Sequence, residues 1–202
     1  LLTDRKFAGA DTLATSYALS QAVKKINPDI ILAGRQAIDG DTAQGGPQVD
    51  EKLGIPQVTY AEEIQEISDT KVVVKRRLER GVEVVSCTLP CLVTVHATAA
   101  PCRPRHAKQV MKYKYARTVT EDTAEGANYL LSLADYPYLK ITEWGTADVG
   151  GEDSSYGMAG SPTKVKKVEN IVFQAKEAKK LTASDEDIDS LISELLANHT
   201  IG

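Results

Sequence analysis

Residues 29–34 read Asp29-Ile30-Ile31-Leu32-Ala33-Gly34, a short and nearly all-apolar run that ends in a glycine. Such a run is typical of a strand buried in a parallel sheet. The chain continues through a polar, glycine-rich stretch to Pro47, and a helix then runs to about Leu53. The pattern leaves open whether this helix starts at Thr42 or at Pro47, because proline suits a first turn but disturbs a helix already under way.

The neighbouring segments predict an open α/β sheet. A helical pattern starts after Asp11 and stops at Asn27-Pro28. Two β-branched runs, Lys71 to Arg77 and Val82 to Cys87, predict a hairpin, and Pro90 to His96 is a further buried-strand candidate. We therefore expect an α/β fold with a sheet flanked by helices.

The C-terminal part has a different character. Residues 142–163 are rich in Gly, Ser, Asp and Pro, which predicts an exposed arm. A helix is predicted after Ser184, with acidic residues in its first turn. Its apolar stripe consists of Ile188, Leu191, Ile192, Leu195 and Leu196. We expect a nucleotide-binding core over residues 1–120, and an arm and helix over 121–202 that dock on the chain's own core or on a partner subunit.

Composition narrows the class of protein. The 202 residues are 42% hydrophobic and 26% charged, an ordinary globular balance. The net charge of −4 gives no reason to expect nucleic acid, and no apolar run approaches the ~20 residues of a membrane span. No secretory signal opens the chain. Because the chain begins with Leu1 and not Met, we expect that its true start is missing.

The cysteines and histidines do not predict catalysis or metal binding. Cys87, Cys91 and Cys102 form neither a disulfide framework nor the paired spacing of a zinc or iron–sulfur site. A sparse, odd set of thiols favours a reducing, cytoplasmic setting. No Cys/His nucleophile pair is evident, so no catalytic residue is assigned.

The glycine-rich stretch after residue 34 is the first candidate site. It follows the carboxyl end of a buried strand, where open α/β sheets bind ligands. Its glycines let the backbone approach a ligand, and the following helix start offers N–H groups to phosphate. Asp39 and Asp41 suit ribose hydroxyls, whereas Gln36 and Gln44 suit an adenine edge. A purely structural turn explains the same residues equally well, because no established phosphate-loop motif is present.

Two further stretches carry polar groups. Residues 7–16 lead into the first helix and place the hydroxyls of Thr12 and Thr15 on one face, although simple helix capping explains them as well. Residues 100–108 combine prolines with basic side chains. They predict either a contact with an acidic partner or a solvated connection.

The run from Gly34 to Gln44, followed by Gly46-Pro47 and by residues 53–57, resembles the β-subunit signature of electron-transfer flavoproteins. Residues 4–16, 89–95 and 159–163 resemble further stretches of that family, in the same order. The resemblance implies a flavodoxin-like or adenine-nucleotide-hydrolase-like parallel sheet. It also implies a heterodimer with an α subunit, in which the missing upstream part supplies the first strands.

The family's β subunit binds AMP in simple carriers and a second FAD in electron-bifurcating members. The pattern Asp39-Gly40-Asp41-Thr42-Ala43-Gln44 resembles the bacterial bifurcating kind, so FAD is expected, with AMP as the alternative. The implied cofactor-binding residues are Ala10, Thr12, Thr15, Gly34, Arg35, Gln36, Ala37, Ile38, Asp39, Gly40, Asp41, Thr42, Ala43, Gln44 and Gly45. The segment from Gly34 to Gly45 is expected to hold the adenosine and phosphates, and the other three to lie near the phosphates or the ring.

In the bifurcating members, the resemblance implies that NADH gives a hydride to the β-subunit flavin. One electron then goes to ferredoxin, and the other passes through the α-subunit flavin to an acyl-CoA dehydrogenase-like or other flavoprotein. Any oxidoreductase activity is thus expected only within a complex. The NADH contacts are expected to lie partly in the missing segment.

A partner-recognition loop is implied at Arg103, Pro104, Arg105, His106, Ala107 and Lys108. It departs from the family's pattern, because Cys102-Arg103-Pro104 replaces the usual Pro-Arg-Tyr and Ala107 replaces a larger anchor. Residues 129–157 are also longer and more aromatic than expected, with Tyr129, Tyr136, Tyr138 and Trp144. The partner's identity therefore stays open, as do two alternative functions, an ATP-using hydrolase-like enzyme and a regulatory module that senses nucleotide.

Overall fold

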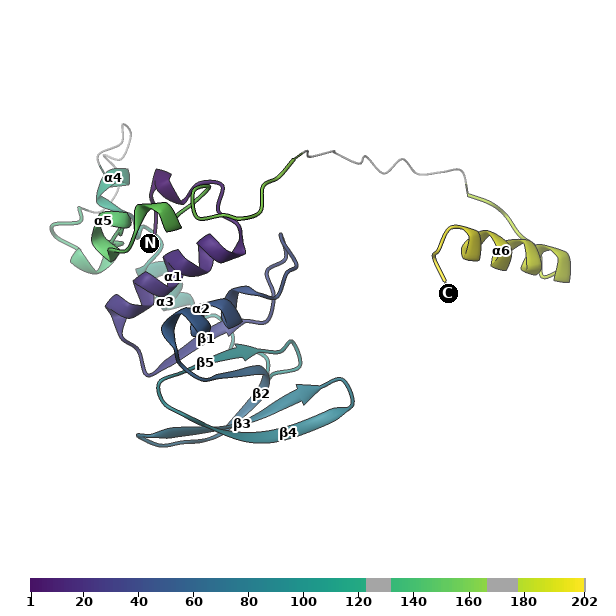
Figure 1. The fold of residues 1–202 in the computed structure, drawn as a ribbon, viewed down its shortest axis with the longest axis horizontal. Coiled ribbons are helices and arrows are strands. Elements are labelled where there is room, and N and C mark those ends of the chain that lie inside the picture. Colours follow the sequence, from purple (N-terminus) through teal and green to yellow (C-terminus); the bar gives the residue numbers. More distant parts are fainter. Residues whose placement is uncertain (123–131, 167–177, 202) are drawn as a thin grey trace. The chain divides into compact units, whose positions relative to one another are not determined.

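The computed structural model describes residues 1–122, 132–166 and 178–201 (Figure 1). The chain forms two compact units, residues 1–164 and residues 165–202. The predicted boundary near residue 120 separates a nucleotide-binding core from an arm and helix that dock on the core or on a partner, and it stays a prediction. Tyr129 lies outside the described residues.

The first unit contains a five-stranded open sheet in the order β1-β5-β2-β3-β4. Strand β5 pairs in parallel with both β1 and β2, whereas β2, β3 and β4 pair antiparallel. The strands are β1 (Ile30–Gly34), β2 (Gln57–Ile67), β3 (Lys71–Leu78), β4 (Gly81–Thr88) and β5 (Cys91–Val95). The predicted α/β sheet and its hairpin are confirmed. The strand predicted at residues 30–34 forms as well, but its predicted burial is wrong: β1 is an edge strand of this sheet, none of its residues is buried, and Leu32 is 63% exposed.

The core of the sheet lies where its parallel and antiparallel parts meet. Val72 and Val74 of β3 pack with Cys91 and Val93 of β5, and all four are fully buried. Burial of this many β-branched side chains supplies the main driving force for the sheet. Strand β2 joins the two parts and is irregular between Val58 and Ala61.

Two helices pack beside the parallel strands. Helix α1 (Thr12–Ile26) contacts α2 (Gly45–Leu53), and α2 contacts β5 (Figure 1). Helix α1 ends at Asn27 in the left-handed conformation, and α2 ends at Gly54 in the same way. The sequence leaves open whether α2 starts at Thr42 or at Pro47. In the structure it begins at Gly45, so Pro47 lies within its first turn.

Gly46 sets how closely α2 approaches the sheet. A side-chain carbon on this residue would lie 2.7 Å from Cγ2 of Thr94 in β5. Real carbon atoms do not approach that closely without a shift of the backbone or of Thr94. The glycine is therefore required for the packing of α2 on β5.

The segment after the sheet is made of short elements. They are α3 (Ala107–Lys112), α4 (Val119–Asp122), η3 (Pro137–Leu139), α5 (Thr146–Val149) and η4 (Asp153–Ser155), and η1 (Arg5–Phe7) precedes α1. Several of their residues are buried, including Leu139, Thr146 and Tyr156. The prediction that residues 142–163 form an exposed arm is wrong, because this segment folds back onto α1.

Tyr156 shows how that segment is held. Its ring lies edge-on against Tyr17 of α1 and against Phe7, and only 2% of Tyr156 is exposed. The Tyr17 hydroxyl accepts a hydrogen bond of 2.9 Å from the amide of Glu152. Nearby, the Lys25 ammonium lies 4.5 Å from the centre of the Trp144 ring.

The second unit contains α6 (Asp185–Ala197), which starts at the predicted cap Ser184. The apolar stripe of α6 is partly exposed, at the side chains of Ile188, Leu191, Ile192 and Leu196. Its docking on a partner stays a prediction. Among the described residues, no helix has both the length and the apolar character needed to cross a bilayer.

Candidate functional site

The loop between β1 and α2 leaves the sheet at Gly34, which pairs with Val95 of β5. It is an exposed surface loop, and the side chain of Ile38 is 99% exposed. Within it, the Asp41 amide donates to the carbonyl of Ala37 at 3.1 Å, and the Gln36 side-chain amide donates to the Asp41 carboxylate. The loop is thus ordered by its own polar groups, and the remaining predicted residues from 35 to 44 lie along it.

Two residues of this loop have left-handed backbone angles without being glycine. The φ angle is 53° at Asp41 and 54° at Ala43. An L-residue in this conformation costs roughly 1–2 kcal/mol relative to right-handed backbone. Such local cost concentrates at functional sites, where a particular backbone course is needed.

The start of α2 is open to a ligand. Its first flanking residue, Gln44, makes no side-chain cap to the helix. Within the described residues, no hydrogen bond engages the amides of Gly45 or Gly46. Unpaired amides at a helix start, together with the positive end of the helix dipole, favour an anion.

The two predicted cofactor stretches meet at this point. The Thr12 hydroxyl at the start of α1 donates to Oε1 of Gln44 at 3.0 Å, and the Gln48 side-chain amide lies 3.5 Å from the same hydroxyl. The other predicted residues of α1 lie beside Thr12, with Ala10 just before the helix and Thr15 one turn further on. The structure therefore brings the start of α1 next to the start of α2.

Asp11 closes the start of α1. Its carboxylate accepts bonds from the amides of Leu13 and Ala14, and from the amide and hydroxyl of Thr163. The bonds from Ala14 and from the Thr163 hydroxyl lower the pKa of this carboxyl to about 2. Capping therefore explains Asp11 itself.

Sequence reasoning missed two residues of α2. Oε1 of Gln48 and Oδ1 of Asp50 are both buried and have no hydrogen-bond partner in the described structure. Burial raises the pKa of the Asp50 carboxyl, and the side chain is only 4% exposed. Neither residue belongs to a recognisable motif, but both follow the glycine-rich stretch by less than two helical turns.

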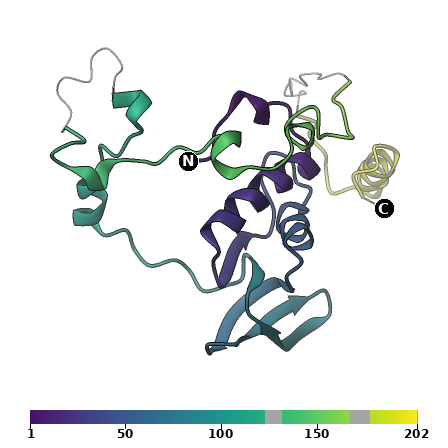
Figure 2. The same cartoon turned by 60° about the vertical axis from the view of Figure 1, so that its left-hand side comes forward.

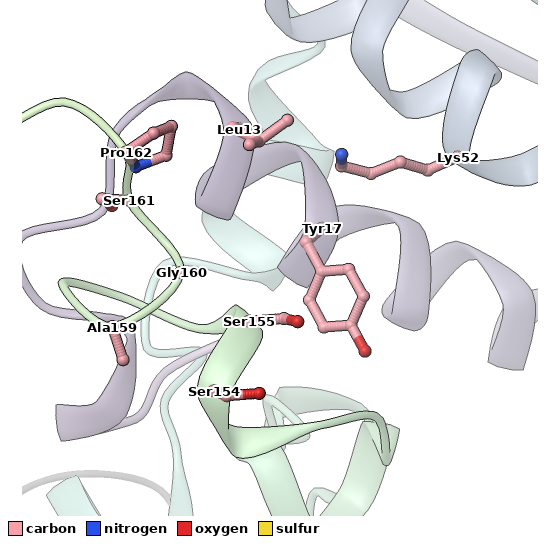
Figure 3. A pocket seen from close by; sticks show the side chains of 9 residues that line it. All are labelled: Leu13, Tyr17, Lys52, Ser154, Ser155, Ala159, Gly160, Ser161 and Pro162. Atoms are coloured by element: carbon pink, nitrogen blue, oxygen red, sulfur yellow. The ribbon is translucent and has the colours of Figure 1, made fainter.

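A separate cavity of about 430 Å³ lies beside α1 (Figure 3). The cavity is lined by Leu13 and Tyr17 of α1, Lys52 of α2, Ser154, Ser155 and residues 159–162. It contains none of the residues from 34 to 45. The loop of residues 35–44 therefore lies outside this cavity.

The expected recognition loop lies elsewhere. Residues 103–108 are exposed, and His106 caps the short helix α3 through a bond from the amide of Gln109. Figure 2 shows α3 well separated from α1 and α2, beyond an extended stretch that leaves β5. Within the described ranges, no cluster of three or more His, Cys, Asp or Glu side chains is arranged to hold a metal.

Residues 1–125 match the model of the electron transfer flavoprotein domain. The chain belongs to the electron transfer flavoprotein family. A protein of Clostridium acetobutylicum named electron transfer flavoprotein subunit beta is 36% identical to it over 197 residues, 98% of this chain and 64% of that protein. Protein FixA of Azorhizobium caulinodans is 38% identical and covers 96% of the chain.

A higher identity, 57%, occurs over 94 residues with the electron transfer flavoprotein subunit beta of Thermoanaerobacterium thermosaccharolyticum. This match covers 46% of the chain and 36% of that protein. The chain therefore represents a β subunit of the electron transfer flavoprotein family. It spans slightly less than two thirds of the length of the relatives that match it throughout.

Proposed function

We propose that the chain forms the cofactor-binding part of a β subunit that holds FAD and transfers electrons together with an α subunit. The observation that carries this proposal is the contact between Thr12 and Gln44, which places a glycine-rich loop, an uncapped helix start and a hydroxyl around one point. In this arrangement the amides of Gly45 and Gly46 would bind a phosphate. The Thr12 hydroxyl would lie beside it.

The other loop residues would hold the adenosine. Asp39 and Asp41 supply acceptors for ribose hydroxyls, and Gln36 and Gln44 supply amides for the adenine edge. Ala10 and Thr15 would lie near the phosphates or the ring. The left-handed backbone at Asp41 and Ala43 supports this assignment, because costly backbone conformations of this kind concentrate at functional sites.

When bound, the flavin would accept a hydride from NADH and pass single electrons to ferredoxin and, through the α-subunit flavin, to a partner flavoprotein. The chain's own part is to position the cofactor and to set its surroundings. Residues 103–108 would form the partner-recognition loop. With AMP in place of FAD, the same loop would serve a simple carrier that does not split electron pairs.

Cofactor analysis of the full protein, purified with its α subunit, tests the proposal. We expect two FAD per heterodimer, yellow colour and bleaching by NADH. One FAD with one AMP would instead identify the simple carrier. A colourless protein that cleaves ATP would refute the proposal in favour of the hydrolase-like alternative, and a colourless protein that only binds nucleotide would favour a regulatory module.

A further inference from the structure

The most uneven distribution of charge in the chain lies between residues 97 and 120. This segment contains six Lys or Arg residues and no Asp or Glu. Because the net charge of the whole chain is −4, the rest of the chain carries −10. Arg117 is buried and pairs with Asp122, so it does not contribute to the surface.

The other five cations are all exposed. They are Arg103, Arg105, Lys108, Lys112 and Lys114. In the part of the chain that the structure describes, none of them forms an ion pair with a carboxylate. Their charge is therefore available to a partner.

Tyrosine rings lie among these cations. The rings of Tyr113 and Tyr138 meet edge-on at 5.9 Å, and Tyr136 meets Tyr138 at 6.1 Å. The Lys112 ammonium lies 5.2 Å from the centre of the Tyr113 ring and 4.9 Å from that of Tyr138. Cation–π attraction thus places this charge on the aromatic cluster.

Helix α3, which carries two of the cations, buries none of its residues. Val110 is 53% exposed and Met111 is 62% exposed. The helix therefore contributes no side chain to the core of the described protein. Exposed Met, Tyr and Arg are enriched in protein–protein interfaces, where large side chains form the centre and polar groups form the rim.

We propose that this basic–aromatic surface, formed by the five cations with Tyr113, Tyr136 and Tyr138, docks a small acidic protein that carries electrons. The inference rests on the proposed function and adds the chemistry of a partner. Opposite charge accelerates and orients the encounter, while the net charge of −10 on the rest of the chain disfavours other orientations. A nucleic acid fits less well, because the net charge of the rest of the chain is negative.

Binding of ferredoxin to the full protein in complex with its α subunit tests the inference. Ferredoxin is the probe, and its affinity is measured at low and at physiological ionic strength. The affinity of the wild-type complex should fall on the order of tenfold as salt screens the surface. The double variant Lys112→Glu/Lys114→Glu should bind on the order of tenfold more weakly or worse at low salt.

The double variant Lys166→Glu/Lys180→Glu is the matched control, since it makes the same change in charge at exposed lysines of the second unit. It should bind ferredoxin within about twofold of wild type. Equal effects of the two double variants would overturn the inference. It would also be overturned by tighter binding of a single-stranded RNA oligonucleotide than of ferredoxin, or by dissociation of the α subunit from the Lys112→Glu/Lys114→Glu variant.

Flavin content and bleaching by NADH are measured on the same preparations. A wild-type complex without flavin would refute the proposed function itself. A flavin-loaded complex whose affinity for ferredoxin does not depend on Lys112 and Lys114 would refute only the docking surface. The two failures are therefore distinguishable.

Discussion

The hydroxyl of Thr12 donates a hydrogen bond to the side-chain oxygen of Gln44, 32 residues further along the chain. This bond joins the start of α1 to the end of the loop that precedes α2. It links two stretches that the sequence offers only as separate candidates. The proposed cofactor site depends on this link, and the first prediction tests it.

Replacement of Thr12 by valine removes the donor and keeps the side-chain shape. A typical hydrogen bond contributes about 1 kcal/mol, so we expect FAD affinity of the flavin-depleted complex to fall roughly three- to tenfold. Flavin fluorescence on rebinding measures the change. Thr12→Ser keeps a hydroxyl and should restore most of the affinity. Equal affinity of the valine and serine variants would show that the bond has no part in binding.

Replacement of Gly46 by alanine should destabilise the protein. The new carbon would meet the Thr94 methyl at 2.7 Å, and forced overpacking of a buried contact costs about 1–3 kcal/mol. Gly45→Ala is the control, because nothing lies within 4 Å of a carbon added there. Urea unfolding should show a lower midpoint for Gly46→Ala only. Adding Thr94→Ser should recover stability, because it removes the clashing methyl and keeps the hydroxyl that accepts from the Tyr60 amide.

Asp50 should make the protein less stable as pH rises. Burial raises the pKa of its carboxyl in the folded state above the value of about 3.9 in an unfolded chain. The folded state therefore holds the proton of Asp50 more tightly than the unfolded chain does. Ionisation of Asp50 begins to destabilise the folded state above the pKa of the unfolded chain, and the full destabilisation is reached above the pKa of the folded state. The stability of Asp50→Asn relative to wild type should therefore grow from about pH 3.5 to pH 7.

Urea unfolding at several pH values measures that difference. Glu51→Gln serves as the control, since it removes a carboxylate from an exposed position on the same helix. A stability difference between Asp50→Asn and wild type that does not change with pH would contradict the assignment of a buried, unpartnered carboxyl.

Asp11 should have the opposite dependence on pH. Its pKa of about 2 lies below the unfolded value, so its stabilising bonds are present above about pH 4 and are lost as the pH falls towards 2. Asp11→Asn should lower the unfolding midpoint at neutral pH and increase hydrogen exchange at the amide of Thr163, which bonds to this carboxylate. Asp69→Asn, at an exposed turn, should leave both unchanged. Unaltered exchange at Thr163 in Asp11→Asn would show that the carboxylate does not hold that segment.

The sheet and its helices follow from local patterns. The apolar run at 30–33, the proline after Asn27 and the glycine at 54 each act on neighbouring backbone, so sequence alone predicts where these elements start and stop. The start of α2 was ambiguous for the same reason, because Pro47 is compatible with several first-turn positions. The structure places the start at Gly45, and the next residue packs closely on Thr94, 48 positions further along the chain.

The segment from 142 to 163 could not be predicted because its partners are distant in sequence. Tyr156 is buried by Phe7 and Tyr17, and Asp11 binds Thr163 across 152 positions. A composition rich in Gly, Ser and Asp is common to exposed loops and to segments that pack through side-chain hydrogen bonds. The same limit applies to Gln48 and Asp50, whose burial depends on how α2 meets the sheet.

Both ends of the 35–44 loop are attached to rigid elements, while its middle is exposed. Gly34 is paired in the sheet, and Gln44 is tied to α1. A change of shape in this chain on loading its cofactor would therefore be confined to a few residues between two fixed points. One scaffold could then accommodate a mononucleotide or a dinucleotide without rearranging its core.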